Sequence, residues 1–176
     1  MTEENLIKAC LKNNRKAQKI LYTKYAPKMM GICLRYASDK EKAHDYLQDG
    51  FVQVFLFLHT FEHKGSFEGW MRKIFVNTAL AKLRKNDPLR ETKELDKVDL
   101  TDGNASALSQ LSAKELIALV QALPDGFRTI FNLYAIEGYS HKEIAELLQI
   151  SEGTSRSQYQ RARGVLKKKV QELYER

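Results

Sequence analysis

The chain has 176 residues, of which 43% are hydrophobic, and a formal net charge of +7. This hydrophobic content supports packed cores and excludes disorder throughout the chain. The two cysteines, Cys10 and Cys33, have neither the number nor the spacing of a disulfide scaffold or zinc site, and no apolar run approaches the ~18 residues of a membrane span. We therefore expect a cytoplasmic protein without membrane insertion.

Charge is distributed unevenly along the chain. Residues 1–85 carry 16 basic and 8 acidic side chains, residues 86–110 carry 3 and 6, and residues 111–176 carry 10 and 8. Two basic segments that flank an acidic connector suit the binding of a polyanion at both ends. A basic surface that is merely solvated has the same counts, so charge alone leaves both interpretations open.

The N-terminal segment has helical periodicity. Apolar residues recur at helical spacing over residues 5–34, where Pro27 and Gly31 are expected to bend the chain. Ser38 and Glu41 form a capping-box pattern that opens a long helix. Its core-facing stripe consists of Leu47, Phe51, Val54 and Leu58. After a turn at residues 63–65, a helix over 66–85 has an inner face of Phe67, Met71, Ile74, Phe75, Thr78 and Leu83.

Periodicity fades over residues 86–110, where proline, glycine and alternating charges indicate a flexible acidic linker. In the domain that follows, residues 111–176, a first helix starts near Ser112 and must end around Leu123, because the residue before Pro124 disfavours helical backbone. A helix over 125–136 comes next. A second capping box, Ser140 to Glu143, opens the next helix, and after a break at 149–151 Ser151 caps a helix that runs toward Tyr174. The sequence therefore predicts an all-α fold of two small helical domains, the second with a helix-turn-helix.

The last helix has two chemically distinct faces. Its inward-facing residues are Tyr159, Ala162, Leu166, Val170 and Leu173. Its polar residues lie mainly elsewhere, and a helix-turn-helix inserts the start of this helix into the DNA major groove. Arginine pairs with guanine and glutamine with adenine, whereas Arg163 and residues 167–169 suit phosphate contacts. An amphipathic helix with a solvated cationic face is the alternative interpretation.

Residues 123–163 resemble region four of bacterial sigma factors, particularly of the extracytoplasmic-function group. The similarity is carried by Leu123-Pro124, Glu137-Gly138-Tyr139-Ser140, Glu143-Ile144-Ala145, Ile150-Ser151, Gly153-Thr154-Ser155-Arg156-Ser157 and Arg161-Ala162-Arg163. The resemblance implies recognition of the minus-thirty-five promoter element, with contacts from Arg156, Ser157, Gln160, Arg161 and Arg163, and contact with the flap of the polymerase β subunit. Gln158 and Tyr159 depart from the family pattern, so no base preference is carried over.

Residues 43–55 resemble the family's second conserved region. The resemblance implies a surface that docks on the clamp helices of the polymerase β′ subunit, formed by Asp45, Gln48, Asp49, Val52 and Gln53. Carboxylates and amides there can pair with arginines of the polymerase. The alternative interpretation is that these residues are simply the solvent-exposed face of an amphipathic helix.

Residues 65–85 resemble the minus-ten recognition and melting segment of the same family. The implied contacts to duplex and single-stranded promoter DNA come from Lys64, Lys73, Asn77, Lys82, Arg84 and Lys85. The loop over 61–66 is expected to cup a flipped base, whereas Phe67 and Trp70 are expected in the core. Ala81 stands where the family usually has an acidic residue.

The resemblance implies a sigma factor that binds the RNA polymerase core, directs promoter recognition and melting, and is not itself an enzyme. An anti-sigma factor is a further expected partner. We expect no cofactor and no metal, because His59 and His63 lack a third ligand. Two alternatives stay open: a free-standing regulator that binds duplex DNA as a homodimer, and a nuclease that uses Asp45 and Asp49.

Overall fold

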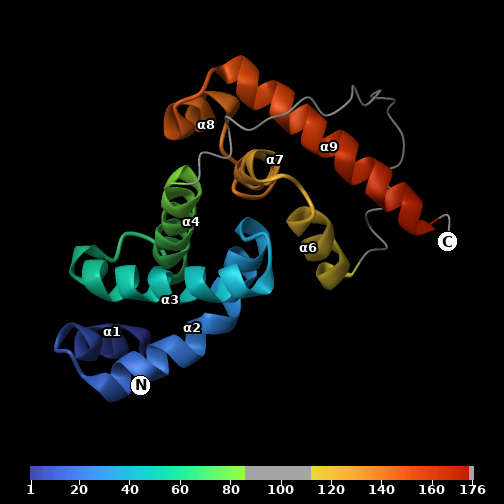
Figure 1. The fold of residues 1–176 in the computed structure, drawn as a ribbon. Helices are drawn as coiled ribbons and strands as arrows, with labels where there is room; N and C mark the ends of the chain where they lie inside the picture. The colour runs from blue at the N-terminus through green and yellow to red at the C-terminus, as the bar shows by residue number, and fades with distance from the viewer. Residues whose placement is uncertain (86–111, 175–176) are drawn as a thin grey trace. The chain divides into compact units, whose positions relative to one another are not determined.

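The computed structural model describes residues 1–85, with the side chain of Lys85 left out, and residues 112–174. All regular secondary structure in these ranges is helical, which confirms the predicted all-α class. The chain divides into two compact units, Met1–Lys85 and Asn86–Arg176 (Figure 1). The predicted linker, 86–110, lies outside the described residues.

The first unit begins with α1 (Glu3–Leu11) and α2 (Arg15–Tyr36). The chain turns sharply between them at Asn13, whose backbone is left-handed with φ 56°. The next residue, Asn14, caps α2, because its side-chain oxygen accepts from the Lys16 and Ala17 amides at 3.0 and 3.1 Å. The single periodic segment predicted over 5–34 is thus two helices, with Pro27 inside the second.

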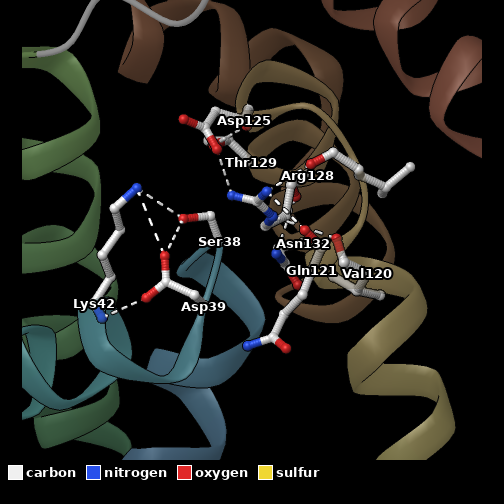
Figure 2. Close-up of polar contacts among 10 residues, drawn as sticks. Ser38, Asp39, Lys42, Val120, Gln121, Asp125, Arg128, Thr129 and Asn132 are labelled. Carbon is white, nitrogen blue, oxygen red and sulfur yellow. Dashed lines mark hydrogen bonds and ion pairs between the residues drawn. The ribbon is translucent and has the colours of Figure 1, made fainter.

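The third helix, α3 (Lys40–Phe57), begins one residue later than its capping-box pattern predicts. Asp39 is the N-cap: its Oδ1 accepts from the Lys42 amide at 2.8 Å, while the Ser38 hydroxyl donates to Asp39 Oδ2 at 2.9 Å (Figure 2). The prediction of Ser38 as cap is wrong, because a carboxylate one residue nearer the helix supplies the acceptor. The predicted core stripe is confirmed, since all four of its residues are buried.

A short 3-10 helix, η1 (Leu58–Thr60), and a loop lead to α4 (Phe67–Lys85). Helices α2, α3 and α4 pack against one another around one core (Figure 1). The predicted inner face of α4 is buried at four of its six positions, and Ile74 and Thr78 are only half-buried. The core takes in Val76, Ala79 and Leu80 in addition, because α4 packs on two neighbouring helices rather than one.

The second unit begins with α6 (Ala113–Gln121), α7 (Asp125–Phe131) and the π-helical turn η2 (Asn132–Ile136). Ser112 caps α6 in a capping box with Glu115. The predicted helix over 125–136 is continuous, but its last turn is π-helical instead of α-helical. Such turns are rare and frequently lie at functional sites.

The helix-turn-helix consists of α8 (His141–Leu148) and α9 (Glu152–Tyr174). The capping box at Ser140 is confirmed, and so is Ser151 as the cap of α9, whose hydroxyl accepts from the Thr154 amide at 3.0 Å. Gln149 makes the turn with left-handed backbone, φ 56°. Helix α9 packs on α6, α7 and α8 (Figure 1). The prediction that Leu173 packs inward is wrong, since it is 45% exposed near the end of α9.

Candidate nucleic-acid and polymerase interfaces

The five residues predicted to contact the polymerase form one stripe along α3. Their spacing places them within one side of the helix, opposite the buried stripe. Asp45, Gln48 and Val52 are exposed, and Asp49 and Gln53 are half-buried. Leu56 continues the stripe and is 59% exposed, close to the 61% of Val52. We call these six residues the α3 stripe: Asp45, Gln48, Asp49, Val52, Gln53 and Leu56.

Leu56 was not predicted among the polymerase-contacting residues, although its position one helical turn after Val52 places it on the same face. Exposed apolar side chains that lie together with a polar rim mark surfaces that another protein can cover. Within the chain, the α3 stripe is anchored at Gln48, whose Nε2 donates to the Tyr22 hydroxyl at 3.4 Å. The stripe therefore offers both an apolar contact and charged groups to a partner.

The residues predicted to contact minus-ten DNA do not all share one surface. Lys73, Asn77 and Arg84 are exposed and fall on one face of α4, by their helical spacing. Lys64 lies in the loop before α4 and pairs with Glu62 at 2.7 Å. Lys82 is turned toward α3, where its ammonium pairs with the Asp49 carboxylate. The side chain of Lys85 lies outside the described residues.

Two aromatic rings of the loop predicted to cup a flipped base, Phe61 and His63, form a cluster with rings of α4. Phe61 is 5.1 Å from Phe67 and 5.5 Å from Trp70 between ring centroids, and His63 is 4.6 Å from Phe61. The predicted core position of Phe67 is confirmed, but Trp70 is only half-buried. The loop bends sharply, since His63 and Gly65 have φ of 57° and 98°. Among the described residues, no three potential ligands gather in a way that suits a metal ion.

The start of α9 presents the residues predicted to recognise the minus-thirty-five element. All five of them are exposed. Arg156 pairs with Glu152 one turn earlier, and the Ser157 hydroxyl donates to the Thr154 carbonyl at 3.1 Å. Gln158 is only 4% exposed, so it packs inside the domain and does not reach a base. Its departure from the family pattern is therefore a change in the packing of α9.

Two models of the sigma-70 family match the chain, Sigma-70 region 2 over residues 21–88 and Sigma-70, region 4 over residues 113–166. The chain belongs to the sigma-70 family. It is an RNA polymerase sigma factor of the extracytoplasmic-function type and directs promoter-specific initiation of transcription.

Relatives of this sigma factor match it over nearly their whole length. The RNA polymerase sigma-H factor of Pseudomonas aeruginosa is 28% identical over 188 residues, which cover 97% of this chain and 95% of the relative. The ECF RNA polymerase sigma-E factor of Haemophilus influenzae is 28% identical over 185 residues, which cover 98% of this chain and 97% of the relative. In fold, the chain is similar to the sigma factor RpoE from Bartonella quintana, solved in complex with the anti-sigma factor NepR. The TM-score is 0.50 at 20% identity, over 85% of this chain and 94% of that one.

The sigma factor holds α9 against α8 through His141, a residue that the sequence did not single out. The ring stacks on Tyr134 at 4.2 Å between centroids, and Nδ1 lies 2.9 Å from the hydroxyl oxygen of the buried Ser155 in α9. Burial lowers the pKa of His141, the positive charge of Arg156 lowers it further, and Glu152 raises it by less. The neutral ring therefore joins α8 to α9 beside the predicted DNA-contacting residues.

A buried arginine of α7 binds the end of α6, the first helix of the same domain. Arg128 is 3% exposed, and its guanidinium donates to the carbonyls of Val120, Gln121 and Leu123 at 3.3, 2.9 and 2.6 Å (Figure 2). It also pairs with Asp125 at 2.6 Å. These carbonyls lie at and just beyond the end of α6; that of Val120 also accepts from the Leu123 amide at 3.1 Å. One side chain thus both helps to cap α6 and fixes it on α7. The signal available in the sequence was a charged residue flanked by the core residues Phe127 and Ile130.

No helix in the parts of the chain that the structure describes is long and apolar enough to cross a membrane.

Proposed function

We propose that the α3 stripe is the surface by which this sigma factor docks on the clamp helices of the polymerase β′ subunit. The observation that carries the proposal is the α3 stripe itself, exposed at four of its six residues and inside the segment that matches Sigma-70 region 2. Val52 and Leu56 supply apolar contact area, and Asp45 supplies a carboxylate for an arginine of the polymerase.

We infer that the first unit holds minus-ten DNA along α4. Lys73, Asn77 and Arg84 form its exposed polar face, and the loop over 61–66 with its aromatic cluster suits an unpaired base. Cations follow the phosphate backbone while aromatic rings stack on bases, each stack contributing about 1–3 kcal/mol. Single-stranded DNA bound in this way favours the melted promoter over the duplex.

In the second unit, we propose that α9 recognises the minus-thirty-five element in duplex DNA. Arg156, Gln160 and Arg161 are exposed at its start, where a helix-turn-helix enters the major groove. Arg163 lies farther along and suits a phosphate. The same domain is proposed to contact the β flap. An anti-sigma factor is a further proposed partner, since a solved protein of similar fold was crystallised with one.

The test is transcription in vitro with the purified chain and polymerase core from the same host. We expect discrete promoter-dependent transcripts, which are lost in Asp45→Ala/Asp49→Ala and in Arg156→Ala/Arg161→Ala. The first variant is expected to lose core binding in a pull-down, and the second is expected to keep it. A wild-type chain that binds duplex DNA tightly as a dimer, and does not bind core, would overturn the proposal in favour of a free-standing regulator.

A further inference from the structure

Lys82 is held by α3 in the free chain. Its ammonium pairs with Asp49, and its Nζ lies 5.6 Å from the centroid of the Tyr46 ring. The Lys82 side chain is 35% exposed, whereas that of the loop residue Lys64 is 83% exposed. The Lys82 ammonium is thus placed between a carboxylate and an aromatic face, away from the α4 face that carries Asn77.

This ion pair links the two surfaces assigned above. Asp49 belongs to the α3 stripe, and Lys82 is one of the cations predicted to contact minus-ten DNA. A lysine neutralises a phosphate and releases its counterion only when its own charge is available. While Lys82 is paired with Asp49, it contributes less to DNA binding than exposed Lys73.

We propose that Asp49 restrains Lys82 in the free sigma factor and releases it to promoter DNA when the polymerase core binds the Asp49 carboxylate. The inference rests on the proposed function of the α3 stripe. Asp49 is then a positioning residue that makes part of the DNA-binding surface depend on core.

The strength of the pair suits such an exchange. An ion pair between partly exposed side chains is weak, whereas a bidentate arginine from a docked partner binds a carboxylate more strongly. We therefore expect release of Lys82 to change DNA affinity by roughly two- to fivefold, the range that exposed ion pairs contribute. Because coupling between two binding sites is reciprocal, DNA bound at Lys82 strengthens core binding by the same factor.

Differential acylation of lysine amines, read by mass spectrometry on the full chain, tests the restraint directly. In the free chain, Asp49→Asn is expected to raise labelling of Lys82 about two- to fivefold relative to Lys73. Asp45→Asn is the matched control, since it removes the same charge from the same stripe without touching the pair, and it should leave Lys82 unchanged. Asp49→Glu keeps a carboxylate and should keep Lys82 protected. Equal labelling of Lys82 in Asp49→Asn and Asp45→Asn would overturn the inference.

Addition of core tests the release. Core is expected to raise labelling of Lys82 in the wild type but not in Asp49→Asn, compared at core concentrations at which the pull-down shows both chains bound. Lys82→Gln should then weaken binding of single-stranded minus-ten DNA by the holoenzyme but not by the free chain, whereas Lys73→Gln weakens both. A bound chain whose Lys82 is no more reactive than in the free chain would overturn this inference alone. Failure of the wild type to bind core, seen in the pull-down itself, would overturn the proposed function as well.

Discussion

Gly50 of α3 lies directly against the ring of Phe75 in α4. A Cβ atom placed on Gly50 would be 2.2 Å from Phe75 Cε1 and 2.5 Å from Cδ1. The Phe75 ring is itself buried and packs edge-on against Phe51, with 5.3 Å between centroids. The absence of a side chain at Gly50 is thus what allows α3 and α4, and with them Asp49 and Lys82, to approach each other.

Gly50→Ala is therefore expected to destabilise the first unit by about 1–3 kcal/mol, the usual cost of overpacking a core. Gly31→Ala is the control: it also lies in a helix, nothing surrounds its Cβ position within 4 Å, and alanine is the better helix former. Denaturant unfolding followed by the fluorescence of Trp70, the single tryptophan, reports on this unit. A Gly50→Ala variant as stable as Gly31→Ala would contradict the packing described.

Arg128→Met is expected to destabilise the second unit by at least ~2 kcal/mol, because the Gln121 and Leu123 carbonyls lose the donor that Arg128 supplies and a carbonyl left unsatisfied costs about 1–3 kcal/mol. Arg163→Met removes an exposed arginine from the same unit and should change stability little. The rate of amide hydrogen exchange in α6, α7 and α9 measures the effect within this unit. Equal exchange rates in the two variants would show that Arg128 does not hold α6.

Acidic pH is expected to destabilise the helix-turn-helix through His141. Its pKa is lowered in the folded chain from the ordinary histidine value of 6.5, so the unfolded chain takes up a proton first as pH falls through that value. The stability contributed by the neutral ring is fully present above pH ~6.5 and declines as pH falls toward the folded-state pKa. Hydrogen exchange of α8 and α9, compared between wild type and His141→Gln at each pH, isolates this contribution. If the wild type instead became more protected than His141→Gln as pH falls, protonation of His141 would stabilise the domain, and the prediction would be wrong.

Arg161 and Arg163 are expected to differ in what they contribute to promoter binding. Arg161→Ala should relax the preference at one base pair of the minus-thirty-five element, by about 1–3 kcal/mol. Arg163→Ala should weaken binding to all promoter sequences alike. It should also reduce the magnitude of the slope of log affinity against log salt concentration by about one. Holoenzyme binding to promoters with this element randomised, at several salt concentrations, separates the two effects. Uniform weakening by both variants would mean that neither recognises a base.

The sequence alone determined the features that depend on neighbours along the chain. Helical periodicity placed Leu47, Phe51 and Val54 in the core, and a spacing of three residues predicted the capping box of Ser140 and Glu143. The resemblance to sigma factors rests on the same kind of local pattern. These signals are legible because hydrogen bonding and periodicity within one helix involve residues three or four apart.

Only the tertiary structure decided which residues pair between helices. The carboxylate of Asp49 pairs with Lys82 across α3 and α4, and His141 meets Ser155 across the turn of the helix-turn-helix. Arg128 satisfies carbonyls that end a different helix. The sequence places each of these side chains on a helix but gives no distance between helices, because that distance is set by how the cores pack, as Gly50 against Phe75 shows.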